Sequence, residues 1–221
     1  IWLPVLGGVI AVAIDGDRYP QRARITALIT CLVTLALCIP LYLDFNPALS
    51  RMQFQENIPW ISVYNINYSL GIDGISLPLI LLTIFTTLLV ILAAWRSVTL
   101  RVAQYMAAFL MMQGMMVGTF AATDSILFYV FWEAILIPMY LSIGVWGSDN
   151  RSYASIKFFL YTFFGSALML IALLYLGVHN PQQNFLIARF YPLKLSMPEQ
   201  VWIFAAFFIA FAVKIPMWPL H

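Results

Sequence analysis

Long apolar runs without charged residues are the feature that most constrains this chain. A hydrocarbon core of about 30 Å is crossed by a helix of about 20 apolar residues. Runs of this kind are Ile25–Leu43, Leu77–Trp95, Val102–Ala122, Ser125–Trp146, Tyr153–Leu176 and a run from about Gln200 to Lys214. The apolar opening, Ile1–Ile14, predicts a further helix. The pattern therefore predicts an all-α fold, a polytopic membrane helix bundle of about seven transmembrane helices.

Composition excludes a soluble or disordered protein. Of the 221 residues, 63% are hydrophobic and only 9% are charged, whereas a soluble domain usually carries about 25% charged residues. Disorder requires low hydrophobicity and high net charge, and this chain has the opposite composition. The net charge of +2 is small and its basic residues are dispersed, so we expect the lipid bilayer and no nucleic acid as a partner.

The polar joints between the runs set the expected organisation and orientation. Two joints are long, Asp44–Ser76 and Gly177–Glu199, and the sequence leaves open whether they hold hairpins or amphipathic pieces. With an external N-terminus, seven basic residues lie on or near the inner side and three on the outer side, which fits the positive-inside rule. We therefore expect the N-terminus outside and an external loop at about residues 44–76. The chain begins with Ile and stops just after a Pro-rich stretch, so we expect it to be a piece of a longer protein.

Glu133 is the first of three charged residues inside apolar runs, and an ionised group at mid-membrane costs at least about 3 kcal/mol. It lies nine residues after Asp124, hence about 14 Å into its helix, too deep for its short side chain to reach the surface. A buried carboxyl beside a cation can exchange a proton near neutral pH. Pro138 is expected to bend this helix because it lacks a backbone N–H. The alternative role is a structural carboxylate that pairs two helices.

Lys214 and Lys157 are the other two intramembrane charges. Lys214 is followed by Pro216 and Pro219, which predict a broken and truncated last helix whose freed backbone lines protein or a water-filled cavity. A desolvated lysine can carry a proton, and the alternative is a lysine that reaches the inner interface. Lys157 lies close to the inner end of its run, where extension to the surface and proton transfer are equally plausible. His221 can extend a proton route, because its side chain titrates near physiological pH.

Several of these residues lie in motifs of a known family. The motifs are Gly71-Ile72-Asp73-Gly74-Ile75-Ser76-Leu77, Phe131-Trp132-Glu133 with Pro138-Met139-Tyr140, Lys157-Phe158-Phe159-Leu160-Tyr161-Thr162, and Phe208-Ile209-Ala210-Phe211-Ala212-Val213-Lys214 with Pro216 and Pro219-Leu220-His221. In this order they resemble the antiporter-like subunits of respiratory complex I, most closely the chain M group that includes the mitochondrial ND four subunits. The resemblance runs over most of the chain.

The resemblance implies a longer subunit with two inverted helix repeats after three N-terminal helices. Residues 1–100 would form that N-terminal region and residues 101–221 the start of the first repeat, helices four to seven, while the second repeat is absent. The family's paired glutamate and lysine match Glu133 and Lys214, its helix-six lysine matches Lys157, and the histidine after the helix break matches His221. A proton would enter from the inner side, reside on Lys214 and pass laterally, with Glu133 tuning Lys214.

The resemblance also implies partners and a location. The chain itself would hold no cofactor or metal, whereas NADH, FMN, iron–sulfur clusters and quinone belong to partner subunits of complex I. It would be a non-redox subunit of the NADH:quinone oxidoreductase in a bacterial inner membrane.

Three alternatives remain at this point. A cation/proton antiporter subunit of the Mrp type shares the glutamate and the lysine. A seven-helix retinal protein would use Lys214 for a Schiff base, although Glu133 lies in the fifth run and Pro216 and Pro219 break the helix beyond the lysine. A purely structural membrane anchor predicts that neutralising Glu133 or Lys214 changes assembly more than transport.

Overall fold

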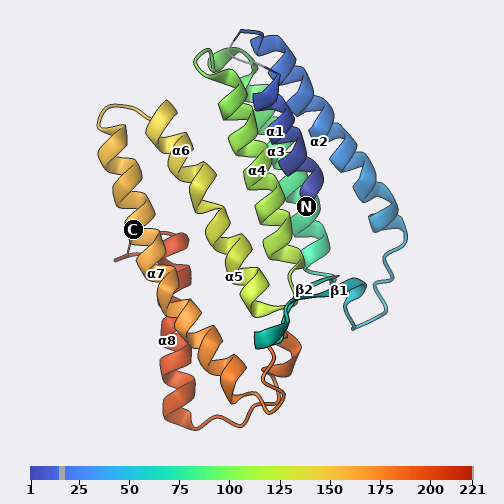
Figure 1. Ribbon diagram of the computed structural model, residues 1–221, viewed down its shortest axis with the longest axis vertical. Coiled ribbons are helices and arrows are strands. Elements are labelled where there is room, and N and C mark those ends of the chain that lie inside the picture. The colour runs from blue at the N-terminus through green and yellow to red at the C-terminus, as the bar shows by residue number, and fades with distance from the viewer. Residues whose placement is uncertain (15–17, 221) are drawn as a thin grey trace.

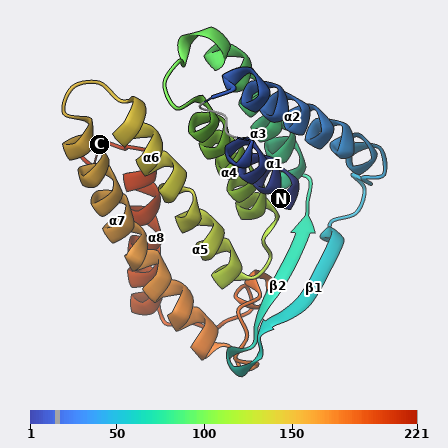
Figure 2. The same ribbon diagram turned by 45° about the horizontal axis from the view of Figure 1, so that its top comes forward.

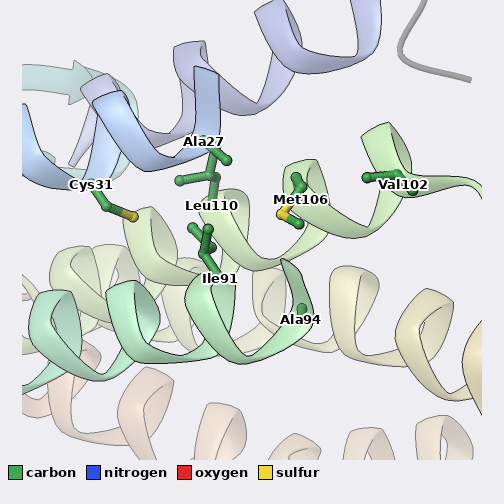
Figure 3. Close-up of a cluster of buried hydrophobic side chains, with 7 residues drawn as sticks. All are labelled: Ala27, Cys31, Ile91, Ala94, Val102, Met106 and Leu110. Carbon is green, nitrogen blue, oxygen red and sulfur yellow. The ribbon is translucent and has the colours of Figure 1, made fainter. Parts of the chain in front are cut away.

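Four helices, α1 to α4, form the first half of the molecule, shown in a computed structural model that describes residues 1–14 and 18–220. Their bounds are α1 Trp2–Ala13, α2 Pro20–Leu43, α3 Ser76–Ser97 and α4 Val102–Ala121. They lie side by side, with α4 in contact with the other three (Figures 1 and 2). Buried side chains of α2, α3 and α4 meet in an apolar cluster around Met106 and Leu110 (Figure 3).

Two glycines let α4 approach its neighbours closely. A Cβ at Gly114 would lie 2.7 Å from the Ile1 carbonyl oxygen and from Val5 of α1. A Cβ at Gly118 would lie 2.7 Å from the Phe131 ring. The Gly-x-x-x-Gly spacing therefore serves close helix contact on two sides of α4.

The second half consists of a broken helix and a helical hairpin. Its helices are α5 Ser125–Ala134, α6 Leu136–Trp146, α7 Arg151–His179 and α8 Met197–Lys214. The pair α7 and α8 packs together, and α6 packs against α7 (Figure 1). The core here is aromatic, with Phe128, Trp132, Phe207 and Phe211 packed against Tyr129, Met169, Leu173 and Ala210.

A polar layer at one end connects the two halves. The joint 44–76 holds an antiparallel hairpin of β1 Gln53–Ile61 and β2 Ile66–Ile72, which decides what the sequence left open. The joint between α4 and α5 runs beside β2, because Thr123 N–H donates to the Ser69 carbonyl at 2.9 Å. On its other side Ser125 N–H donates to the Phe185 carbonyl at 2.8 Å. The hairpin and the α7–α8 joint therefore lie at the same end (Figure 2).

The predicted membrane bundle is confirmed, whereas the number of about seven transmembrane helices stays a prediction. Five helical segments are long and apolar enough to cross a membrane: α2, α3, the combined α5–α6 segment, α7 and α8. Helix α1 is a shorter apolar helix of 12 residues. Helix α4 has 20 residues but is the central helix, with small residues and a fully buried Gln113 facing other helices instead of lipid. The division into regions 1–100 and 101–221 stays a prediction.

Candidate functional site

The segment that carries Glu133 is broken where its proline predicts. Helix α5 ends at Ala134, and α6 begins at Leu136 after the single residue Ile135. Pro138 has no N–H to bond the carbonyl of Ala134, four residues earlier, and its ring crowds that carbonyl. The sequence prediction of a bend is confirmed, and the break lies one turn before the proline. Glu133 therefore lies directly before the break.

Lys214 is the last residue of α8, and the helix break predicted after it is confirmed. Residues 215–220 form turns. The Lys214 Nζ donates a hydrogen bond to the Trp132 carbonyl oxygen at 3.1 Å and lies 4.2 Å from the centroid of the Trp132 ring. Trp132 is the eighth residue of the 22-residue segment Ser125–Trp146. Contact with Trp132 therefore places the ammonium within the span of that segment, not at either of its ends.

Trp132 holds this position through aromatic packing. Its ring lies 5.6 Å from the Phe211 ring in an edge-to-face arrangement and 5.7 Å from the Phe128 ring. Phe211 is one turn before Lys214 on α8, so the aromatic contact and the lysine contact fix the same pair of helices. The negative face of an aromatic ring attracts a desolvated cation.

Glu133 faces the same cluster from the neighbouring position. The polar side chains beside its carboxyl are Tyr129 on its own helix, Ser166 on α7 and Lys214 on α8. The Ser166 hydroxyl donates to the backbone carbonyls of Thr162 and Phe163. Its Oε1 atom is buried and has no hydrogen-bond partner. Glu133 and Lys214 therefore lie in one cluster, but no salt bridge joins them. The lysine is instead bound to Trp132.

Lys157 is not part of this cluster. Lys157 is exposed on α7 with its Nζ 5.8 Å from the Tyr153 ring centroid. It precedes Ser166 by nine residues, about 13 Å along a helix. His221 lies outside the described residues. Its neighbour Leu220 lies near α7, because Tyr161 Oη donates to the Leu220 carbonyl at 2.7 Å.

Three residues of the cluster were not singled out from the sequence. Tyr129 lies four residues before Glu133 and thus on the same helix face, which is a usable signal. Trp132 was noted only as part of a family motif, because a carbonyl ligand has no sequence signature. Ser166 is on another helix, so no spacing could have placed it at Glu133. Among residues 1–14 and 18–220, no group of three or more His, Cys, Asp or Glu residues is placed to hold a metal ion.

Two family models together match most of the chain. Residues 24–123 match the model described as NADH-ubiquinone oxidoreductase chain 4, amino terminus. Residues 122–221 match NADH:quinone oxidoreductase/Mrp antiporter, TM. NADH-quinone oxidoreductase subunit M of Rhodobacter capsulatus is 40% identical over 235 aligned residues, covering 100% of this chain and 45% of the relative. The chain belongs to the subunit M/chain 4 family.

A plant relative and a solved structure agree with this family. NADH-ubiquinone oxidoreductase chain 4 of Arabidopsis thaliana is 38% identical, covering 100% of this chain and 44% of the relative. A chain in the structure of respiratory complex I from Thermus thermophilus with bound NADH superposes with a TM-score of 0.84 at 28% identity, covering 99% of this chain and 44% of that one. The chain thus spans a little under half the length of the relatives it matches.

The family weighs against two of the alternatives. The model for residues 122–221 is shared with Mrp antiporters, whereas the model for residues 24–123 is described as chain 4 alone. The relatives carry oxidoreductase names as well, so an Mrp-type subunit is less favoured. The family assignment also weighs against the seven-helix retinal protein.

Proposed function

We propose that this chain is part of a proton-translocating membrane subunit of NADH:quinone oxidoreductase, in which Lys214 carries the proton and Glu133 controls it. One observation supports this most strongly. An ammonium and a carboxyl, both half-buried, lie in one cluster within the membrane-spanning segments of the bundle, and each lies at a helix break. Placing charges at this depth is costly, and a use in proton transfer explains why the chain keeps both.

The two contacts available to Lys214 supply a simple switch. In one state, its Nζ binds the Trp132 carbonyl and faces the Trp132 ring, which are neutral groups. In the other, it moves toward the Glu133 carboxylate, and the opposite charge favours the protonated lysine. Movement between the two partners therefore changes how tightly Lys214 holds its proton. The hydroxyls of Tyr129 and Ser166 beside Glu133 supply further groups that can pass a proton.

In this scheme Lys157 and His221 act before and after Lys214 on the proton route. Lys157 lies on α7 toward the inner side, where it would receive protons before Lys214. His221 follows the broken end of α8 and would pass protons laterally. The step involves no redox chemistry in this chain: NADH, FMN, iron–sulfur clusters and quinone would be held by the partner subunits of complex I. The subunit would lie in a bacterial inner membrane with its N-terminus outside, and other membrane subunits would flank it.

Replacement of Glu133 in the full-length protein tests this function. Inverted membrane vesicles that carry Glu133→Ala or Glu133→Gln would be assayed for NADH oxidation and for NADH-driven acidification, with complex content measured on a native gel. Glu56→Gln is the matched control, because Glu56 is an exposed carboxylate on β1. We expect normal complex content and acidification reduced at least tenfold in both Glu133 variants, with the control unchanged.

Two results would contradict the proposal. Unchanged acidification at normal complex content makes Glu133 a tolerated structural carboxylate. Loss of complex content in proportion to the loss of acidification supports the structural anchor instead. The isosteric Gln variant separates these cases, because it keeps the size and hydrogen-bonding groups of the side chain and removes only its charge and its proton exchange.

A further inference from the structure

A cavity of about 500 Å³ lies at the polar end of the bundle where α7 ends and α8 begins. Its lining includes three basic side chains, His179, Arg189 and Lys194, and all three are exposed to the cavity side of the joint. The one acidic residue in the lining is Glu199. None of these groups belongs to the Glu133–Lys214 cluster, which lies deeper in the bundle.

The carboxylate of Glu199 is already engaged by other groups. It accepts hydrogen bonds from the Ser196 N–H at 2.6 Å and from the Ser196 hydroxyl at 2.5 Å, which closes the capping box of α8. It also accepts one from the Tyr175 hydroxyl, and the Tyr175 ring stacks on His179 with 3.9 Å between centroids. Glu199 is thus committed to the start of α8, which leaves the Arg189 and Lys194 charges available to an anion.

A separate apolar groove of about 260 Å³ lies between α7 and α8. The two spaces meet at Glu199, which lines both. The groove runs along the membrane-spanning part of the two helices and is lined by Leu168, Ile171, Ala172, Trp202, Ile203 and Ala206. Trp202 is 76% exposed and Ile171 is 64% exposed. In the part of the subunit that the structure describes, the groove is therefore open along the surface of the two helices.

We propose that this combined site binds an anionic phospholipid, with the phosphate in the basic cavity and one acyl chain in the groove between α7 and α8. Charge complementarity carries the assignment: two available cations lie in the joint beyond the ends of α7 and α8, and the apolar groove lies between these two membrane-spanning helices. A free anion would occupy only the basic cavity and would leave the apolar groove empty. An apolar protein helix would fill the groove and leave Arg189 and Lys194 without a counter-charge. A phospholipid satisfies both parts at once.

Bound lipid can be counted in the assembled complex that carries the full-length subunit. The complex is delipidated in detergent and titrated with phosphatidylglycerol or phosphatidylcholine, and bound lipid is read by native mass spectrometry. Arg189→Gln combined with Lys194→Gln removes the basic pair, and Arg51→Gln, an exposed arginine of another joint, is the control. Loss of both charges removes the attraction for the phosphate, so we expect phosphatidylglycerol binding to weaken at this site by a factor of about ten or more. Phosphatidylcholine binding should change little.

The groove is tested independently of the charges. Ala206→Trp fills it and should lower binding of both lipids, whereas Leu82→Trp, at a lipid-exposed position of α3, should not. A photoreactive benzoylphenylalanine at Trp202 should become crosslinked to a phospholipid in the otherwise unaltered complex. Crosslinking to a protein segment, or unchanged phosphatidylglycerol binding in the double variant, would overturn the proposal. Neither readout depends on proton transport, so the site stands or falls separately from the function proposed above.

Discussion

The helices of the two halves of the molecule pack against one another through different kinds of side chain. Helices α1 to α4 pack through small residues and aliphatic side chains, such as Ala27, Cys31, Ile91 and Leu110, in close contact (Figure 3). Helices α5 to α8 pack through aromatic rings, contain two helix breaks and hold the intramembrane charges. Of the five buried side-chain polar atoms without a hydrogen-bond partner in the described residues, three belong to α5: Ser125 Oγ, Trp132 Nε1 and Glu133 Oε1.

This contrast indicates that the first half mainly stabilises the fold, whereas the broken helices hold the groups for proton chemistry. Buried polar atoms without partners are costly, and a chain that collects them on one broken helix has a use for polar groups there. The first half satisfies its buried threonines locally: Thr30, Thr34, Thr83 and Thr87 each donate to a backbone carbonyl four residues earlier. Among the described residues, its two unpartnered buried atoms, Arg24 Nε and Gln113 Nε2, lie on different helices. Substitutions in the first half should therefore affect assembly, and substitutions at the broken helices should affect transport.

Gly114→Ala should give the largest loss of stability and tests the packed half. The added Cβ would lie 2.7 Å from the Ile1 carbonyl oxygen and 2.7 Å from the Val5 side chain, so α1 would have to shift away from α4. Overpacking of this kind costs roughly 1–3 kcal/mol. The matched control is Gly74→Ala, where a Cβ meets nothing within 4 Å. Thermal dissociation of the purified complex should occur at lower temperature in the first variant alone, with the ratio of acidification to NADH oxidation unchanged in the intact fraction.

Trp132→Leu tests the broken half, with an intermediate effect. It removes the ring 4.2 Å from Lys214 Nζ and keeps the backbone carbonyl that accepts its hydrogen bond. A cation–π contact contributes about 0.5–2 kcal/mol. Its loss should weaken the binding of Lys214 at Trp132 relative to Glu133, and acidification per NADH should fall several-fold. Trp132→Phe keeps a ring and should retain more activity. If both variants pump normally, Trp132 is only a packing residue. That result would contradict the claim that substitutions at the broken helices affect transport.

Asp73→Ala should have the smallest effect and concerns the start of α3. The Asp73 carboxylate accepts from Ser76 N–H at 2.7 Å and Ile75 N–H at 3.1 Å, and the Ser76 bond is the main reason why its pKa is below the ordinary value. The loss should be about 1 kcal/mol.

The stabilisation by Asp73 should also depend on pH. Because the pKa in the folded state is lowered, the contribution is present above the ordinary value of the carboxyl and is lost as the pH falls through the folded value. The two proteins should therefore converge in thermal stability in acid. Asp44→Ala, at an exposed carboxylate of another joint, is the matched control for the loss of a surface carboxylate.

The sequence was sufficient for the bundle and for the depth of its charges, because apolar length and helix breaks are local properties. Glu133 directly before a break and Lys214 at a helix end follow from the placement of Pro138 and Pro216 in the sequence. The hairpin β1–β2 was left open, since neither strand shows the alternation of one buried and one exposed face: nearly all residues of β1 are exposed, whereas every residue of β2 is buried or half-buried.

The hydrogen-bond partner of Lys214 could not be predicted from the sequence. Its location on a separate helix means that only the packing of α5 against α8 decides whether Nζ meets the Glu133 carboxylate or the Trp132 carbonyl. A backbone carbonyl is present at every residue, so composition and spacing give no preference for Trp132. The same holds for Ser166, which reaches Glu133 through the packing of α5 on α7.

The most direct measurement is a double-mutant cycle on Glu133 and Lys214 in the full-length subunit. Glu133→Gln, Lys214→Met and the combined variant would be compared for acidification per NADH oxidised in inverted vesicles, at matched complex content. If the two residues work as one unit, the double variant should pump no worse than the poorer single variant. Independent losses that multiply in the double variant would contradict the account, because Glu133 and Lys214 would then act separately and not through each other.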